Sequence, residues 1–254
     1  MRGAQLIVLR HSSQMKMRSV ILLLCLVFPP NLVFAAGADA LLQRTGEYRQ
    51  ELSRIEASGK TGSLEKLLQT GDTIAAELKP VIERLSNEDY ASVEKNMKGY
   101  IVNRVEVILV EPDRRFFSKL AETIGTAQDR LYFNFMLKIM PEGYWPVYIM
   151  RQTDVGGCID FGTGSLSVLY KQGTGLRPNI TGYYRTQLDK IIEDIVDRLI
   201  SGTCACGKIA SVKKELTTFL EMNPNASIVD RIRSRRDTLQ RGDHAIRESC
   251  IGGT

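Results

Sequence analysis

Two cysteines separated by one residue, Cys204 and Cys206, stand in the stretch SGTCACGKIA. Thiols at this spacing can bind a soft metal ion, act as a redox pair, or each form half of a separate disulfide. A Cu(I) or zinc site needs further ligands nearby, and the closest methionine downstream is Met222. Redox pairs usually have the spacing CxxC in a βαβ context, which this sequence lacks. The pattern favours two structural half-cystines, with a metal-handling protein as the alternative.

The N-terminus predicts export. Lys16 and Arg18 precede the apolar run SVILLLCLVF at 19–28, and small residues follow a break at PPN. This order of positive charge, apolar run and small residues is that of a secretory signal peptide. We therefore predict a signal peptide over residues 1–35, cleaved after Ala35, and a periplasmic or secreted protein.

Two alternatives to this leader stay open. Translation can start at Met15 or Met17, because the residues before them are an unusual prefix to a leader. The apolar stretch could also be an uncleaved anchor, but residues 19–36 are barely long enough to span a bilayer and Pro29 interrupts them. After cleavage we expect no transmembrane span.

Removing residues 1–35 changes the charge balance. This segment holds four of the 34 basic residues and none of the 29 acidic ones, so residues 36–254 carry 30 basic and 29 acidic side chains. A net charge of +1 supplies no field that would attract nucleic acid, and we expect no nucleic-acid partner. His244 is the one histidine left, and no GxSxG motif is present, so the sequence offers little for nucleophilic catalysis.

An even number of cysteines remains in the exported part of the chain. In an oxidising compartment this predicts two disulfides, made from Cys158, Cys204, Cys206 and Cys250. A direct bridge within CAC would need a very tight ring. The other two pairings join Cys158 to one cysteine of CAC and Cys250 to the other. Each bridge closes a loop of roughly 45 residues, for which chain entropy predicts about 4 kcal/mol of stabilisation.

Apolar residues recur at helical spacing along most of the chain. The stretches that show it lie within residues 41–55, 74–85, 90–108, 116–124, 131–140, 184–199, 209–220 and 228–239. SNED at 86–89 predicts a capping box for the third helix, which we expect to run through VEVILVE at 105–111 and to end at Pro112. These patterns predict an all-α fold of about eight helices, forming a single domain over residues 36–254.

An irregular segment, residues 141–182, interrupts the helical pattern. Its first part, residues 141–164, combines prolines, five glycines, four aromatic residues and Cys158. Such a composition is too aromatic for a plain linker. We expect a short helix at SLSVLYKQ and a second loop at GTGLRPNITG.

Two glycine-containing motifs resemble nucleotide-binding sequences only in part. GTGSLS at 162–167 begins like a dinucleotide fingerprint, but Ser167 replaces the third glycine and no βαβ unit surrounds it. SGKTG at 58–62 lacks the first glycine of a P-loop, because Arg54 stands there. We expect no nucleotide cofactor and no metal.

The irregular segment also holds the best candidates for binding. Tyr144, Trp145 and Tyr148 combine large apolar area with polar ends, which suits partner recognition, although they could equally be aromatic anchors under a loop. Asp154 and Asp160 flank GGC and are the first acids to consider for carboxylate chemistry, against the alternative that they cap turns.

A basic stretch near the C-terminus, RIRSRRDTLQR at 231–241, is a further candidate contact. Arg231, Arg235 and Arg236 would lie near one another on the helix, either as a solvated face or as a contact for an anionic partner.

These observations predict a non-enzymatic binding protein of the bacterial envelope, acting through residues 141–164. Its partner would be an envelope protein or a cell-wall component. The alternative is a carboxylate-dependent hydrolase or lyase that acts on cell-wall glycan, which would need two acids within about 10 Å in one pocket.

Overall fold

The computed structural model describes the chain from Pro30 onward, apart from short gaps. The described residues are 30–141, 144–153, 156–242, 245–248 and 250, and side chains are described from Asp39. The predicted signal peptide lies outside the described residues, except where helix α1 begins at Pro30. Asp154 and His244 also lie outside them.

The described chain is mainly helical, as predicted, but it is not purely α. Its helices are α1 (Pro30–Ser58), α2 (Glu65–Leu78), α3 (Asn87–Asn96), α4 (Arg114–Ile124), α5 (Ala127–Ile139), α6 (Ser165–Leu176), α7 (Gly182–Ser201), α8 (Ile209–Met222) and α9 (Val229–Gln240), with 3-10 turns η1 (Ile82–Arg84) and η2 (Arg177–Asn179). Its strands are β1 (Tyr100–Asn103), β2 (Leu109–Pro112), β3 (Ile149–Arg151), β4 (Gly157–Ile159), β5 (Cys204–Ala205) and β6 (Arg247–Glu248).

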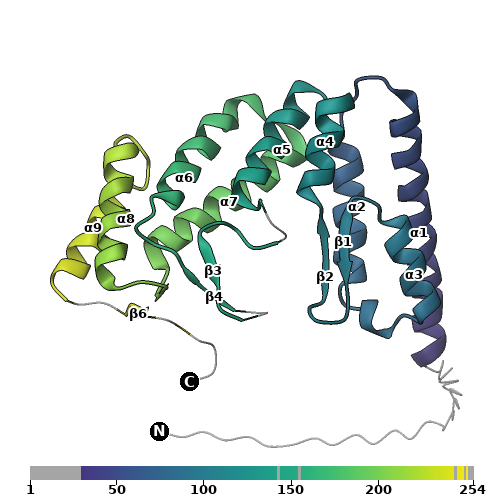
Figure 1. The fold of residues 1–254 in the computed structure, drawn as a ribbon, viewed down its shortest axis with the longest axis horizontal. Coiled ribbons are helices and arrows are strands. Elements are labelled where there is room, and N and C mark those ends of the chain that lie inside the picture. The colour runs from purple at the N-terminus through teal and green to yellow at the C-terminus, as the bar shows by residue number, and fades with distance from the viewer. Residues whose placement is uncertain (1–29, 142–143, 154–155, 243–244, 249, 251–254) are drawn as a thin grey trace, which may run out of the picture.

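The helices form a curved layer, with α1 and α3 at one end and α8 and α9 at the other (Figure 1). The hairpins β1–β2 and β3–β4 lie on the same side of this layer. None of the helices described is long and apolar enough to cross a membrane.

The helix predicted through VEVILVE is replaced by a hairpin, so that prediction was wrong. Helix α3 ends at Asn96, and β1 and β2 pair antiparallel with Val102 opposite Val110. Val105, at the tip of the hairpin, is 85% exposed. The β-branched residues of this stretch fit the pleated surface of a strand at least as well as a helical face.

Gly99 explains why α3 stops where it does. Its φ is +90°, a conformation that glycine adopts far more readily than other residues. A Cβ at this position would also lie 2.6 Å from the ring of Phe116. The backbone must therefore leave the helical path here, and the chain enters β1 at Tyr100.

Side-chain caps fix several helix starts. Ser86 accepts a hydrogen bond from the backbone N–H of Asp89 at 3.0 Å, which confirms the start predicted from SNED. Asp113 caps α4 through the amides of Arg115 and Phe116. Thr126 and Asp129 form a reciprocal capping box at the start of α5.

The second half of the irregular segment is more helical than predicted. Helix α6 continues through GTGL to Leu176 and is followed at once by η2, where a loop was expected. Gly173 within α6 lies against Ile192 and Phe135, so the helix passes close to α7 and α5 there. Close packing of this kind can hold a glycine-containing helix that propensity alone would not favour.

A small four-stranded sheet, in the order β3-β4-β5-β6, joins the irregular segment to the C-terminal residues. Strand β5 pairs parallel with both β4 and β6, with Ala205 opposite Ile159 and Glu248. The sheet is therefore built from three segments that are far apart in the sequence, and the two residues of CAC that form β5 lie near its centre.

The cysteines of this sheet answer the question that CAC raises. Cys158 lies at disulfide distance from Cys206, and Cys204 from Cys250, with Cα–Cα distances of 4.9 and 5.6 Å. The expected scheme, in which each partner takes one cysteine of CAC, is confirmed. Cys158 is fully buried.

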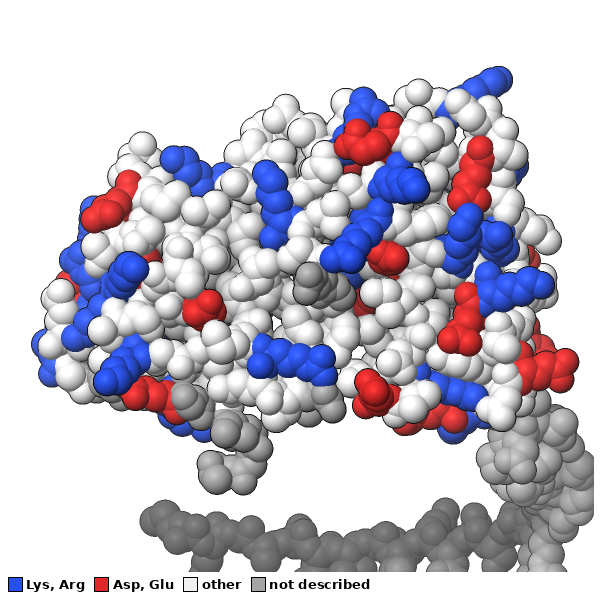
Figure 2. Space-filling view, in the orientation of Figure 1, with Lys and Arg blue, Asp and Glu red and all other residues white. Residues whose placement is uncertain are grey.

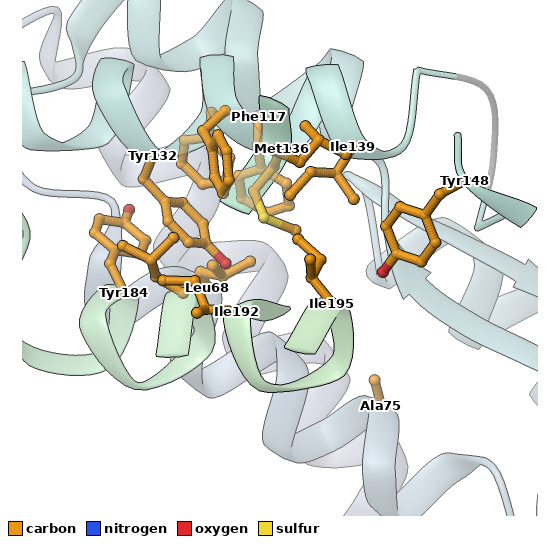
Figure 3. Packing of buried hydrophobic residues seen from close by; sticks show 14 of the residues in the cluster. Leu68, Ala75, Phe117, Tyr132, Met136, Ile139, Tyr148, Tyr184, Ile192 and Ile195 are labelled. Atoms are coloured by element: carbon orange, nitrogen blue, oxygen red, sulfur yellow. The ribbon is translucent and has the colours of Figure 1, made fainter. Parts of the chain in front are cut away.

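One cluster of buried side chains runs from Leu41 on α1 to Leu239 on α9. Its centre is aromatic: Phe117 stacks on Phe133 at 5.2 Å between ring centroids, and Tyr132 on Tyr184 at 4.2 Å (Figure 3). Stacked and edge-on ring pairs of this kind add to the burial energy.

Candidate functional site

The glycine-rich stretch 162–167 is folded around a carboxylate of the protein itself. The side chain of Glu215, which is fully buried, accepts backbone N–H bonds from Gly162, Gly164 and Ser167 at 3.0, 2.8 and 3.1 Å. It also accepts the hydroxyl of Ser167 at 2.9 Å. Backbone amides of this kind would hold a phosphate in a nucleotide-binding loop, but here Glu215 occupies them.

Tyr144 and Trp145 lie at the beginning of the irregular segment. Both are half-buried, and their ring centroids are 5.7 Å apart. Among the described residues, no hydrogen-bond partner meets the buried indole Nε1 of Trp145. The two rings form a local aromatic pair beside Pro146.

Tyr148 lies in the core rather than on the surface. It is 2% exposed, and its hydroxyl donates a hydrogen bond to Asp194 of α7 at 2.7 Å. Its carbonyl accepts the backbone N–H of Asp160 at 2.9 Å. In Figure 3 its ring stands apart from the central aromatic residues. Tyr148 is therefore an aromatic anchor under a loop, which is the alternative that the sequence left open, and not a surface contact.

A cleft of about 750 Å³, named here the central cleft, brings several charged residues together. It lies between α2 and β2 on one side and α7 on the other, with α5, Arg114 and residues 146–148 closing it. The residues that line it are Leu68, Asp72, Thr73, Ala75, Ala76, Lys79, Val110, Glu111, Pro112, Arg114, Tyr132, Phe133, Met136, Met140, Pro146, Tyr148, Tyr183, Gln187, Lys190, Ile191 and Asp194.

Asp72 is a carboxyl group of the central cleft with a raised pKa. Its two oxygens accept hydrogen bonds from the hydroxyls of Tyr100 and Tyr183, at 2.8 and 2.7 Å. Burial raises the pKa of Asp72 above its ordinary value, although both of these hydrogen bonds act in the opposite direction. An acid whose pKa is shifted by burial in a cleft is a candidate functional group.

Glu111 and its cationic neighbours form the second charged group of the central cleft. One oxygen of Glu111 pairs with Lys79, and the other lies 3.9 Å from Nη2 of Arg114. Arg114 is only 9% exposed. Glu111 therefore lies between two cations of the central cleft wall, Lys79 and Arg114.

The opposite wall carries a third acid, Asp194. It accepts the hydroxyl of Tyr148 and, at 2.9 Å, a hydrogen bond from Arg198 four residues further along α7. Lys190, one turn earlier, is exposed at the edge of the central cleft. Basic and acidic side chains are interspersed over the face seen in Figure 2, in keeping with the near-equal numbers of basic and acidic residues over 36–254.

The central cleft is therefore a hollow with an apolar base and a few convergent polar groups. Its volume lies within the range of small-molecule sites, about 300–1,000 Å³. The carboxylates offer acceptors, the cations offer donors, and Phe133 and Met136 offer apolar contact. Such an arrangement can bind an amphipathic organic molecule, or place two acids beside a substrate.

Of the site residues predicted from the sequence, Tyr148 lines the central cleft, whereas the described residues Tyr144, Trp145 and Asp160 do not. The cysteines of CAC are each paired, and no cluster of three or more metal-ligating side chains occurs in the part of the chain that the structure describes. Paired cysteines supply no free thiolate for a soft metal.

The arginines of the basic stretch are divided in their roles. Arg235 donates from Nη1 to the carbonyls of Arg198 and Leu199, at 2.9 and 2.6 Å, and from Nη2 to that of Gly202. Arg235 thus caps the C-terminus of α7 by donating to carbonyl groups at the end of this helix. Burial lowers its pKa to about 10. Arg231, in contrast, is exposed.

Sequence reasoning missed Asp72, Glu111, Arg114 and Asp194 as members of one site. They come from α2, β2, α4 and α7, and their spacing carries no motif. One feature of this region is visible in the sequence, because Gly71 interrupts the amphipathic α2. The structure gives the reason: a Cβ at this position would collide with the hydroxyl of Tyr100.

Comparison with known proteins finds no relative of this chain. No protein-family model, no curated protein and no solved structure matches the chain.

Proposed function

We propose that this chain is an exported, non-enzymatic binding protein of the bacterial envelope, and that it holds part of a cell-wall component in the central cleft. The observation that carries the proposal is the cleft itself, with its ligand-sized volume, apolar base and convergent polar groups. Tyr148 links it to the irregular segment 141–164, from which we expected binding.

The proposed compartment rests on two features. The N-terminal sequence has the order of a secretory leader, and the cysteines lie in two pairs at disulfide distance. Both suit an oxidising compartment outside the cytoplasm, periplasmic or secreted.

Binding rather than catalysis is favoured by the way the acids are held. Asp72 is engaged by two phenol hydroxyls, and Asp194 by Tyr148 and Arg198. Groups that are tied to their neighbours form rigid walls, and rigid walls lower the ordering cost of binding.

The experiment is to fill the central cleft. Ala76 is exposed on α2 and lines it, whereas Ala91 is exposed on α3 and does not. Soluble cell-wall fragments released by a muramidase would be titrated into each protein by calorimetry. Ala76→Phe should abolish the binding heat, and Ala91→Phe should leave it unchanged. Equal binding by both variants, or no binding to the unmodified protein, would overturn the proposal.

A second function, a carboxylate-dependent hydrolase or lyase of cell-wall glycan, is favoured by one observation. Asp72 has a raised pKa and Glu111 is ion-paired, and both line the same hollow. Two carboxyl groups that line one hollow are the residue types that such chemistry uses as proton donor and as base or nucleophile.

The two functions are separated by turnover. Release of soluble fragments from insoluble cell-wall glycan should fall about 100-fold or more in Asp72→Asn if Asp72 is the proton donor. Asp197→Asn, on the exposed side of α7, is the matched control. If the unmodified protein releases no soluble fragments from cell-wall glycan, this second function is ruled out.

A further inference from the structure

Arg114 is a buried cation whose hydrogen bonding is incomplete. Its side chain is 9% exposed, and Nη1 donates to the carbonyl of Pro112 at 2.7 Å. Its Nε is buried and meets no hydrogen-bond partner among the described residues. A guanidinium has five N–H donors, and burying it without partners is costly.

The charge of Arg114 is also compensated only in part. Glu111 lies 3.9 Å from its Nη2 and is shared with Lys79. Asp72 has a raised pKa, and its oxygens are taken by Tyr100 and Tyr183. Neither acid of this wall therefore gives the guanidinium of Arg114 a close hydrogen-bonded partner.

The opposite wall does not supply such a partner either. Asp194 is balanced by Arg198, and Lys190 adds a further positive charge at the edge. The amides at the start of α4 are not the site either, because the side chain of Asp113 already accepts two of them. Because Nε has almost no exposed surface, the donor left for a molecule in the central cleft is Nη2, which Glu111 approaches only to 3.9 Å.

We propose that the central cleft recognises the carboxylate of an acidic cell-wall fragment, and that Arg114 is the residue that binds it. This inference rests on the proposed function and names the ligand group. Arginine matches carboxylates in a two-bond geometry. A carboxylate carries one negative charge, which one guanidinium balances, whereas a phosphate monoester carries up to two. The body of the fragment then lies on Phe133 and Met136, with Lys190 at the open edge.

The test uses three probes on the same sugar body, titrated into the exported protein. One is the disaccharide of N-acetylglucosamine and N-acetylmuramic acid, with its lactyl carboxylate free. The second is its neutral carboxamide. The third has the lactyl carboxyl joined to a short peptide, so that the free carboxylate lies at the peptide end. These arms separate a sugar carboxylate from a peptide carboxylate as the group recognised.

We expect at least one acid probe to bind tenfold or more tightly than the carboxamide, and Arg114→Gln to remove that preference. Arg114→Lys, which keeps the charge but loses the fork, should retain part of it. Lys190→Gln, at an exposed position, should weaken acid binding two- to threefold and remains informative if Arg114→Gln does not fold.

Two outcomes would overturn the inference, and they are distinct. Equal binding of acid and carboxamide by the unmodified protein removes carboxylate recognition but leaves the proposed binding function standing. No binding of any probe, together with no heat from cell-wall fragments, removes both. A preference that survives in a folded Arg114→Gln would reject Arg114 as the binding residue.

Discussion

The carboxylate of Glu215 accepts the backbone N–H of Gly164 at 2.8 Å, across the interface of α8 with the start of α6. Glu215 is fully buried, yet its described partners are neutral donors of the stretch 162–167. A single acid thus fixes a turn that glycine alone would leave unrestrained, because it satisfies amides that no helix bond uses.

Replacing this acid should destabilise the protein without touching the central cleft. In Glu215→Gln the amide nitrogen would face donors such as Ser167 or Gly162, so we expect a loss of about 3 kcal/mol in the free energy of unfolding. Urea denaturation would measure it. Glu221→Gln, exposed on the same helix, is the control and should change stability by less than about 0.5 kcal/mol.

Tyr148 should behave as a core residue. Tyr148→Phe keeps the ring but removes the hydrogen bond to Asp194, and we expect it to cost about 1.5 kcal/mol. Tyr148→Ala should cost about 3–5 kcal/mol through the cavity it leaves. Trp145→Ala, at a half-buried position, should cost less than Tyr148→Ala. Melting temperatures that are unchanged in both Tyr148 variants would refute this placement.

Arg235 and Arg231 should differ, although they lie one turn apart on α9. Arg235→Met removes donors to three carbonyls at the end of α7, so a loss of about 2 kcal/mol is expected. Arg231→Met should have little effect. Thermal unfolding of the two variants side by side checks this, and equal melting temperatures would contradict the assigned role.

Asp72 should make stability depend on pH. Burial raises the pKa of its carboxyl group in the folded state, and the charge of Glu111 raises it as well. The hydrogen bonds from Tyr183 and Tyr100 and the charge of Arg114 lower it, but burial is the largest effect. Protonated Asp72 is thus favoured by folding, so its stabilising contribution is complete below the ordinary pKa of about 3.9 and is lost as the pH rises through the raised value. Relative to Asp72→Asn, the unmodified protein should lose stability over that window. A difference that stays constant with pH would contradict this.

The two cysteine pairs should differ in accessibility. Cys158 is fully buried, whereas Cys204 and Cys250 are half-buried. Mild reduction followed by alkylation should therefore label Cys204 and Cys250 first, as peptide mass spectrometry would show. Serine replacement of both cysteines of either pair should cost about 4 kcal/mol. Four thiols that alkylate without reductant would mean that no bridge forms.

Much of the helical framework could be predicted from the sequence, because apolar periodicity and end signals act locally. Ser86 and its cap illustrate this. The hairpin β1–β2 could not, because the residues of VEVILVE continue the apolar spacing of α3. Gly99 decided the outcome through its packing against Phe116, a contact invisible in the sequence.

The candidate site was beyond local reasoning for a different reason. Asp72 and Asp194 are common residue types on ordinary helices, and only the packing of α2 near α7 makes them two walls of one hollow. Their protonation depends on burial, which is a property of the folded chain. The aromatic segment drew attention to Tyr148, which lines the hollow, but gave no hint of Arg114.

The position of Trp145 has a spectroscopic consequence. It is the one tryptophan in the sequence, and its half-buried indole lies against Tyr144 and next to Pro146, a residue of the central cleft. Indole emission shifts in wavelength with the polarity around the ring, so this protein carries its own fluorescent reporter. Because Pro146 lines the central cleft, we expect occupation of the cleft to change this emission on the unlabelled chain.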